Sequence, residues 1–275
     1  MTTSLAHEYR SDYSPSWCPG CGDFGVLKSI DMAFQELALH PEQVVVISGI
    51  GCNGRFPHGF KTYGFHTVHG RVLPIAQGIS IVNPALSVIG IAGDGDAFSI
   101  GGGHVAHAAR RNPDVTYIVL DNGIFAQTKG QPSPTTPPGF KTKVTPAGYQ
   151  EDPIDISQLS LAYGVSFLAR GFTGKPNHLA HLIAEGIRHR GFALIHILNP
   201  CPTFHDTWKE YPAKVEEIGP DYDSTSYDAA WNLVRRSNKI PIGIIFKQEK
   251  RTLEERLRVG AGAHLELKSI LASFR

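Results

Sequence analysis

Two residues, Asp94 and Asn122, combine a side-chain type and a spacing that can do chemistry. Asp94 lies between Gly93 and Gly95, directly after the largely apolar run 88–92, and Asn122 follows a second apolar run, 115–120. The stretch between the runs, 98–111, has helical character. The pattern is that of a strand–helix–strand unit in which a carboxylate follows one strand and an amide follows the next.

A parallel sheet brings the carboxyl ends of its strands to one edge, so these two side chains are expected to meet around one cation. Oxygen ligands from a carboxylate and an amide suit a hard cation such as Mg²⁺, which binds phosphate groups of substrates and cofactors. The pattern therefore predicts a Mg²⁺–phosphate site at the edge of a sheet.

Composition excludes several classes of protein. The chain has 275 residues, of which 41% are hydrophobic, so it is long enough for one large domain. Its net charge of +1 gives no reason to expect a nucleic-acid partner. The apolar runs are too short to cross a membrane, and the polar start of the chain has no signal-peptide core. We expect a cytoplasmic protein.

The rest of the pattern supplies the elements that would position the site. Helices are expected over 26–39, 73–82, 98–111, 156–163, 178–188 and 226–236, and strands over 44–48, 88–92, 115–120, 165–169 and 193–198. This alternation predicts an α/β fold with a doubly wound, mostly parallel sheet and helices on both faces. The stretch 131–153 is rich in proline and has no periodicity, so we expect a functional loop.

One domain is expected over residues 1–236, followed by a C-terminal extension over residues 237–275. The extension contains a short apolar, strand-like piece, a charged run over 247–258 and an amphipathic end. Because the charged run carries both signs, we expect a solvated helix face, with contact to a partner subunit as the alternative.

The four cysteines are expected to form one metal centre. Cys18-Pro-Gly-Cys21 lets two thiolates face the same centre, Cys52 follows a predicted strand, and Cys201 lies between two prolines. Four thiolates fit a structural Zn²⁺ or an iron–sulfur cluster. A single Cys-x-x-Cys pair with two distant cysteines favours a [4Fe–4S] cluster, because a zinc ribbon normally has two such pairs. Four unrelated buried thiols are the remaining alternative.

The stretch Gly49-Ile-Gly-Cys-Asn-Gly54 matches the glycine pattern of a dinucleotide-binding turn. Its context argues against that function. No helical pattern opens at Gly54, and no acidic residue follows at the required distance. We therefore do not expect nicotinamide or flavin binding here.

Asp94, Asn122 and the four cysteines together resemble one family, the β subunits of 2-oxoacid:ferredoxin oxidoreductases, which bind thiamine diphosphate. The matching stretches span residues 17–202, about two-thirds of the chain: Trp17-Cys-Pro-Gly-Cys-Gly22, Gly49-Ile-Gly-Cys52, His66-Thr-Val-His-Gly-Arg71, Gly93-Asp-Gly-Asp96, Asp121-Asn-Gly-Ile-Phe125, Thr128-Lys-Gly-Gln-Pro-Ser-Pro-Thr-Thr136 and Asn199-Pro-Cys-Pro202. The Thr128–Thr136 stretch is similar to the branch that uses 2-oxoglutarate or several 2-oxoacids.

The resemblance implies a role for each matched residue. Asp94, the side chain of Asn122 and the backbone carbonyl of Ile124 would bind Mg²⁺, which would bridge the two phosphates of thiamine diphosphate. The other residues implied in cofactor binding fall into three groups: Gly93 with Gly95 and Asp96, the last two offering backbone N–H groups to the diphosphate; Gly51, Cys52 and His69 near the cofactor's rings; and Cys18, Cys21, Cys52 and Cys201 around one [4Fe–4S] cluster.

The resemblance also implies partners. Thiamine takes up electrons on decarboxylation, and a nearby low-potential cluster can accept them one at a time, which NAD cannot. Coenzyme A would capture the acyl group and ferredoxin would carry the electrons away. The glutamate that activates thiamine is not evident in this chain, so no catalytic residue is assigned to it. A separate α subunit with a pyrimidine-binding domain is expected to supply that residue, in an (αβ)2 assembly.

The substrate implied is 2-oxoglutarate, giving succinyl-CoA and CO2. Its distal carboxylate needs a cation, and Arg55 and Lys129 both lie in loops at the predicted site. Three alternatives stay open: pyruvate or a broad range of 2-oxoacids as substrate, a non-oxidative thiamine-dependent decarboxylase with structural zinc, and an assembly subunit without turnover. The intact pair Asp94 and Asn122 counts against the last.

Overall fold

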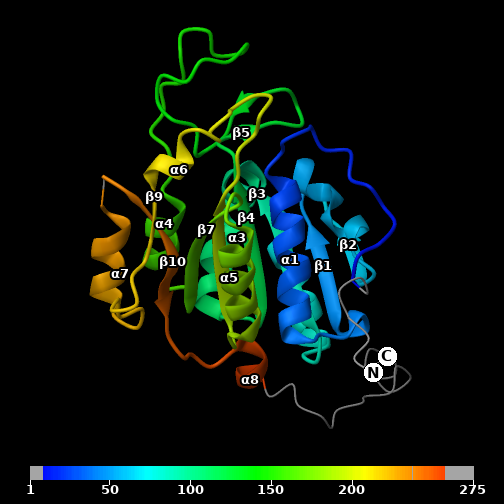
Figure 1. Cartoon of the computed structure of the whole chain (residues 1–275). Coiled ribbons are helices and arrows are strands. Elements are labelled where there is room, and N and C mark those ends of the chain that lie inside the picture. The colour runs from blue at the N-terminus through cyan, green and yellow to red at the C-terminus, as the bar shows by residue number, and fades with distance from the viewer. Residues whose placement is uncertain (1–8, 237, 258–275) are drawn as a thin grey trace, which may run out of the picture.

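A computed structural model describes residues 9–236 and 238–257. In this part of the chain an eight-stranded sheet has the order β2-β1-β3-β4-β8-β7-β10-β9 (Figure 1). Its strands are β1 (Val44–Ser48), β2 (Tyr63–His66), β3 (Ser87–Gly93), β4 (Val115–Asp121), β7 (Phe167–Phe172), β8 (Phe192–Leu198), β9 (Val215–Glu217) and β10 (Ile240–Lys247). Neighbouring strands are parallel except β7 and β10, which are antiparallel. The predicted fold class is confirmed.

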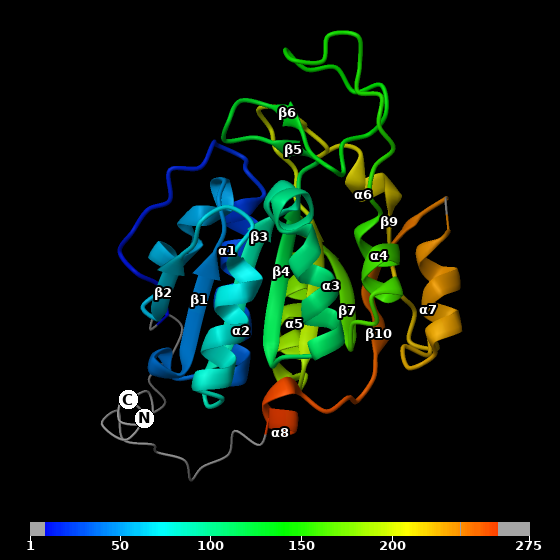
Figure 2. The ribbon, with the colours of Figure 1, turned by 180° about the vertical axis from the view of Figure 1, so that it is seen from behind.

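Helices cover both faces of the sheet, as Figures 1 and 2 show from opposite sides. The helices α1 (Asp23–Leu37) and α5 (Pro176–Arg188) pack on one face. The other face carries α2 (Val72–Val82), α3 (Gly102–Arg111), α4 (Ile156–Ala162) and α7 (Tyr227–Val234). Shorter elements complete the described chain: α6 (Tyr211–Lys214), α8 (Leu253–Leu257), the 3₁₀ helices η2 (Pro41–Gln43) and η3 (Cys52–Gly59), the π-helical turn η4 (Asp96–Ile100), and a two-stranded ribbon of β5 (Ile124–Phe125) and β6 (Gln131–Pro132).

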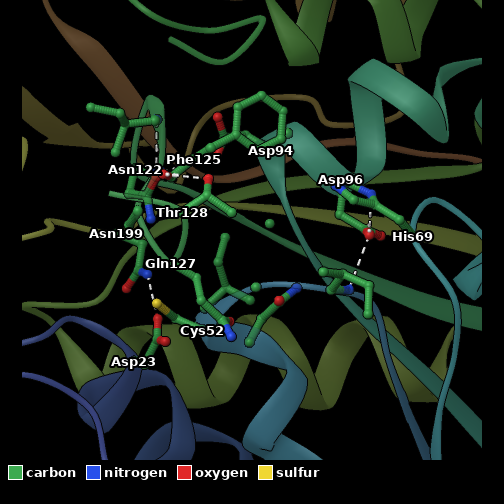
Figure 3. Close-up of a pocket in the computed structure, with 18 residues that line it drawn as sticks. Asp23, Cys52, His69, Asp94, Asp96, Asn122, Phe125, Gln127, Thr128 and Asn199 are labelled. Carbon is green, nitrogen blue, oxygen red and sulfur yellow. Dashed lines mark hydrogen bonds and ion pairs between the residues drawn. The ribbon is translucent and has the colours of Figure 1, made fainter. Parts of the chain in front are cut away.

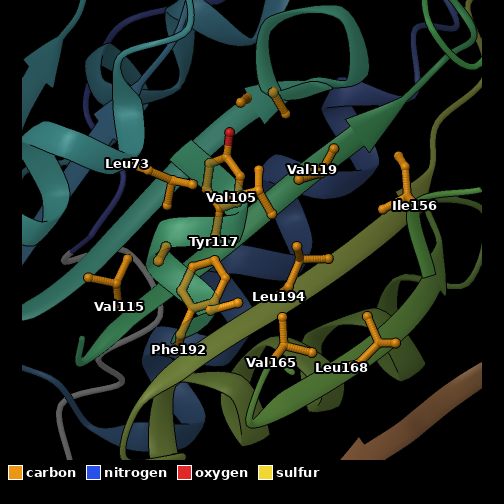
Figure 4. Close-up of a cluster of buried hydrophobic side chains, with 14 of the residues drawn as sticks. Leu73, Val105, Val115, Tyr117, Val119, Ile156, Val165, Leu168, Phe192 and Leu194 are labelled. Atoms are coloured by element: carbon orange, nitrogen blue, oxygen red, sulfur yellow. The ribbon is translucent and has the colours of Figure 1, made fainter. Parts of the chain in front are cut away.

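The core fixes the central strands because both of their faces are buried. In Figure 4, Val119 and Leu194 from β4 and β8 pack with Leu73 of α2 and Val105 of α3. Every residue of β1 and β8 is buried. Continuous apolar runs of this kind are expected for parallel strands covered on both sides. They are also why these strands could be predicted closely from sequence.

Two elements in the stretch 49–71 were missed. The strand β2 lies at the edge of the sheet with all four residues exposed, so it carries no apolar run. The second is the 3₁₀ helix η3, which begins inside the glycine pattern at Cys52 and runs to Gly59, where the sequence shows no helical pattern. The helix predicted over 98–111 is divided: η4 precedes α3. The strand predicted over 165–169 is β7, which begins at Phe167.

The C-terminal part begins inside the sheet. β10 pairs with β7 and β9, and Ile242 and Ile245 are fully buried, so residues 240–247 are part of the same sheet as the preceding strands. The charged run is only partly a solvated face. Glu254 is 3% exposed, and its carboxylate accepts hydrogen bonds from the Ser80 hydroxyl and the Asp114 backbone N–H. The amphipathic end and the first eight residues lie outside the described residues.

Candidate active site

Asp94 and Asn122 lie at the same edge of the sheet, as the sequence pattern predicts. Asp94 follows β3 and Asn122 follows β4, and the two strands pair in parallel. The backbone N–H of Asn122 donates to Asp94 Oδ1 over 3.4 Å. The carboxylate and the amide therefore occupy adjacent strand ends.

A cavity opens beside this pair, and we call it the strand-end cavity (Figure 3). In Figure 3, Asp96 and His69 lie on one side of it and Asn122, Phe125 and Thr128 on the other. It is lined by Asp23, Ile50, Gly51, Cys52, Asn53, His69, Gly93, Asp94, Gly95, Asp96, Leu120, Asn122, Ile124, Phe125, Ala126, Gln127, Thr128 and Asn199. All the residues expected at the diphosphate, its Mg²⁺ and the cofactor's rings are among them.

Two glycines make the shape of this cavity possible. Gly51 has φ of +124°, a conformation that side chains rarely allow, where the chain leaves β1. A Cβ at Gly95 would collide with the ring of Phe125. The π-helical turn η4 starts one residue later, and such turns often occur at functional sites.

The polar groups of the cavity fit a phosphorylated ligand with its cation. Asp94 is 1% exposed, and burial together with the neighbouring Asp121 raises its pKa to about 7. A cation would supply the missing counter-charge. In the described part of the chain, several lining residues keep buried polar atoms without a hydrogen-bond partner, among them Asn53 at both amide atoms, Asp23 and Asp96 at Oδ2, and Asn199 at Oδ1. Such groups in a cavity point to a polar ligand.

Asp96 fixes the loops on the far side of the cavity. Its Oδ1 accepts backbone hydrogen bonds from Ile50, at 3.0 Å, and from Gly70, at 2.9 Å. The same oxygen lies 2.8 Å from Nδ1 of His69, whose ring is about one-third exposed. One buried carboxylate thus joins the turn after β1 to the loop that carries His69.

All four cysteines line a second cavity, the cysteine cavity. It shares a wall with the strand-end cavity, because Asp23, Cys52, Asn122, Ala126 and Gln127 line both. The three cysteine loops are also tied to one another. Gly22 N–H donates to the Pro200 carbonyl over 3.1 Å, and the Trp17 indole donates to the Cys52 carbonyl over 2.8 Å.

Two thiols of this cavity, those of Cys21 and Cys52, are held in their neutral form. Burial, with Asp23 nearby, raises the pKa of Cys52 to about 11 and the pKa of Cys21 further still. Asp23 is 2% exposed, and burial raises its own pKa to about 6. A cationic centre would reverse this preference, because a bound metal stabilises thiolates.

Both predicted substrate-binding cations, Arg55 and Lys129, line the cysteine cavity and are absent from the lining of the strand-end cavity. Arg55 also lines a third cavity, together with Ile50 and Gly51 of the strand-end lining. Lys129 is exposed and has φ of 78°, in a turn closed by its N–H donating to the Ala126 carbonyl over 3.1 Å.

Sequence reasoning missed several polar residues that the fold brings to the site. Asn53, Gln127 and Asn199 lie within or beside matched stretches but have no pattern of their own. Arg170 and His196 are single polar residues in apolar strands, and that contrast was the sequence signal that could have identified them.

Among the described residues, no three His, Cys, Asp or Glu side chains converge tightly enough to chelate one metal ion. In the same part of the chain, no helix is long and apolar enough to cross a membrane.

Comparison with protein families agrees with this geometry. The family described as "Thiamine pyrophosphate enzyme, C-terminal TPP binding domain" matches residues 49–197. The family that describes the C-terminal part of the pyruvate ferredoxin oxidoreductase β chain matches residues 201–261. The first match contains Asp94 and Asn122, and the second includes Cys201.

Individual relatives are similar over most of the chain. The β subunit of 2-oxoacid:ferredoxin oxidoreductase 2 from Aeropyrum pernix is 40% identical over 91% of this chain and 86% of that protein. The KorB protein of the 2-oxoglutarate oxidoreductase of Mycobacterium tuberculosis is 45% identical over 72% of this chain and 53% of that protein.

A solved structure extends the likeness to the fold. A chain of the 2-oxoglutarate:ferredoxin oxidoreductase from Magnetococcus marinus, solved with 2-oxoglutarate, coenzyme A and succinyl-CoA bound, matches with a TM-score of 0.92 and 40% identity. The match covers 100% of this chain and 97% of that one. The chain therefore belongs to the family of 2-oxoacid:ferredoxin oxidoreductase β subunits, oxidoreductase subunits with a thiamine diphosphate-binding domain.

Proposed function

We propose that this β subunit holds Mg²⁺–thiamine diphosphate in the strand-end cavity and a [4Fe–4S] cluster in the cysteine cavity. Its reaction is the CoA-dependent oxidative decarboxylation of 2-oxoglutarate. The observation that carries the proposal is the shared wall, since five residues line both cavities. Electrons released in one cavity would have only this wall to cross.

In the strand-end cavity, Asp94, the Asn122 side chain and the Ile124 carbonyl would bind Mg²⁺, and Gly93, Gly95 and Asp96 would face the diphosphate. Gly51, Cys52 and His69 would lie along the cofactor's rings. When bound, thiamine diphosphate supplies the electron sink for decarboxylation. The buried Asp94 and the unpartnered amide of Asn53 support this assignment.

In the cysteine cavity, Cys18, Cys21, Cys52 and Cys201 would hold the cluster. One zinc ion keeps its sulfur ligands at about 2.3 Å, so four thiolates of a zinc site lie within roughly 4 Å of one another. A cluster places its own iron and sulfide atoms between the cysteines, and the pattern of one Cys-x-x-Cys pair with two distant cysteines favours it. Structural zinc with a non-oxidative decarboxylase is the second candidate.

For the substrate, Arg55 and Lys129 are the candidate partners of the distal carboxylate. Support for 2-oxoglutarate comes from the KorB relative and from the Magnetococcus enzyme, which was solved with that substrate and coenzyme A. The Aeropyrum relative carries the broader name of a 2-oxoacid enzyme, so pyruvate or several 2-oxoacids form the alternative.

A partner must complete the site. No glutamate lines the strand-end cavity in the described part of the chain, so an α subunit would supply the residue that activates thiamine, in an (αβ)2 assembly. The segment after β10 is our candidate for part of that contact. Ferredoxin would accept the electrons, and we place the enzyme in the cytoplasm, where its four free thiols would stay reduced.

The test uses the chain purified together with its α subunit in the absence of oxygen. With 2-oxoglutarate, coenzyme A and ferredoxin, we expect succinyl-CoA and reduced ferredoxin to form together. Release of CO2 without coenzyme A or an electron acceptor would instead identify a non-oxidative decarboxylase and contradict the proposal.

A further inference from the structure

A series of buried polar side chains leads from Asp94 into the sheet. The Thr135 hydroxyl lies 2.8 Å from Asp94 Oδ2 and 2.8 Å from Asp121 Oδ1. The other carboxylate oxygen of Asp121 lies 2.9 Å from Nε2 of His196. Nδ1 of His196 is 3.3 Å from Nε of Arg170. The four residues beyond Asp94 form what we call the Asp94 support chain.

The hydrogen-bond donors on both sides of Asp121 point towards its carboxylate. Arg170 is a donor only, so Nδ1 of His196 must accept from it. Nε2 of His196 then carries the proton and donates to Asp121. Asp121 is left as the acceptor for Thr135, which has one proton to share between the two carboxylates. Each member therefore fixes the orientation of the next.

Both ends of the support chain are anchored. Arg170 and His196 are 5% exposed and face each other in register on β7 and β8. The Arg170 guanidinium also donates to the Ser157 hydroxyl over 2.7 Å. At the other end, the fully buried Thr136 accepts from Ser133 N–H over 2.7 Å and donates to the Gly123 carbonyl over 2.6 Å. These bonds hold the Thr135 backbone against the turn after β4.

We propose that Thr135, oriented by Asp121, His196 and Arg170, positions the Asp94 carboxylate for its divalent cation and makes that site selective for Mg²⁺. The inference rests on the metal site of the proposed function. The contact of Oδ2 with Thr135 fixes the torsion of the Asp94 side chain, and Oδ1, which accepts a long 3.4 Å hydrogen bond from the Asn122 N–H, would bind the cation.

Metal chemistry gives this role a distinct consequence. Mg²⁺ requires a nearly ideal octahedral arrangement at about 2.0–2.1 Å, whereas Ca²⁺ accepts looser and more variable geometry at about 2.3–2.6 Å. A carboxylate that has lost its support should therefore bind Mg²⁺ much less well and Ca²⁺ only slightly less well. Loss of partners outside the ligand set typically weakens metal affinity roughly 10- to 100-fold.

The test measures binding of thiamine diphosphate to the metal-free full-length chain by titration calorimetry, with MgCl2 or CaCl2 supplied over a range of concentrations. Thr135→Val should raise the Mg²⁺ concentration needed for half-maximal binding roughly 10- to 100-fold and the Ca²⁺ concentration far less. Thr135→Ser, which keeps the hydroxyl, should restore the wild-type values. Thr142→Val is the matched control, because that hydroxyl bonds only within its own turn.

Asp121→Ala provides a second route if Thr135→Val does not fold. Alanine removes the side chain altogether, whereas the amide of asparagine could still bond both neighbours. Thr135 and His196 therefore lose their shared partner, and Mg²⁺ should again be affected more than Ca²⁺. An unchanged Mg²⁺ requirement, or equal losses for both cations, would overturn the inference while leaving the metal site intact. If the wild-type chain bound thiamine diphosphate equally well without any divalent cation, the proposed metal site itself would be wrong.

Discussion

Asp94 is the residue on which the strand-end cavity depends. It is almost fully buried at the end of β3, and the pKa of its carboxyl is raised to about 7 because burial and Asp121 both disfavour its charge. Above pH 7 the buried Asp94 carboxylate of the ligand-free protein is ionised with no cation beside it, and this buried charge lowers the stability of the fold. That cost to stability is what metal binding would offset.

Asp94→Asn should therefore have two opposite effects. Binding of Mg²⁺–thiamine diphosphate should fall at least roughly 100-fold, because a charged oxygen ligand is lost. At pH 8 the ligand-free variant should melt at a higher temperature than the wild type, since a buried charge has been removed. Calorimetric titration and thermal melts measure both. Unchanged cofactor binding would contradict the assignment, and iron content, as an internal control, should not change.

Lys129 allows substrate choice to be tested without changing the backbone. Lys129→Gln keeps the chain length and a side chain at the same left-handed φ. Loss of a charged partner should raise KM for 2-oxoglutarate roughly 10- to 100-fold while leaving KM for pyruvate nearly unchanged. Lys141→Gln, an exposed residue of the proline-rich loop, is the control. Equal increases for both substrates would mean that Lys129 does not contact the distal carboxylate.

At the scale of the elements, two short helices, η4 and η3, bring residues to the wall of the strand-end cavity. The turn after β3 enters the π-helical turn η4 at Gly95, where only a hydrogen side chain leaves room for the ring of Phe125. The 3₁₀ helix η3 carries Cys52 and Asn53 to the wall of the strand-end cavity. Short, irregular helices here replace regular ones, as is common beside ligands.

Gly95→Ala tests this packing at the level of the element. The backbone at Gly95 has φ of −65°, which alanine adopts readily, so any loss comes from the contact with Phe125. We expect a loss of about 1–3 kcal/mol in stability and weaker binding of thiamine diphosphate, measured by chemical unfolding and titration. Gly103→Ala, in the open first turn of α3, is the control and should be neutral or stabilising. If the two variants behaved alike, the contact would have no special importance.

Elements with a buried apolar face could be predicted from sequence, and those without one could not. β1, β3, β4 and β8 were found because their runs are continuous, while β2 was missed because its residues are exposed. β10 was found as an apolar piece, but nothing local indicated that it pairs antiparallel with β7. Register between distant strands depends on tertiary packing, which a single sequence does not express.

At the scale of the whole molecule, the fold brings two cavities to one edge of a single sheet. The four cysteines come from three segments that are far apart in the sequence, at residues 18–21, 52 and 201, yet one cavity contains them all. Sequence reasoning foresaw this convergence from the strand ends. It could not foresee the support chain, because Arg170 and His196 become neighbours only through the pairing of β7 with β8.

Acid should weaken the whole fold through His189. Its ring is buried, and its Nε2 lies 2.8 Å from the Ser166 hydroxyl. Burial lowers its pKa to about 4, below the ordinary value of 6.5. The neutral ring therefore contributes stability that is present above pH 6.5 and is lost as the pH falls towards 4, by up to about 3 kcal/mol.

His189→Gln removes this proton uptake. Between pH 7 and pH 4.5 its free energy of unfolding should fall less steeply than that of the wild type. Denaturant unfolding of both proteins at several pH values measures the difference, and the comparison cancels the carboxyl groups that titrate in both. Parallel pH profiles would show that His189 does not control acid stability.

The metal content of this chain decides whether an iron–sulfur cluster lies beside the thiamine site. The full-length chain is expressed without its partner and purified in the absence of oxygen. We predict a brown protein with about four iron and four acid-labile sulfide atoms per chain, both lost on replacing Cys201 with serine. A colourless protein containing one zinc ion per chain would contradict the cluster assignment and, with it, the proposed oxidative reaction.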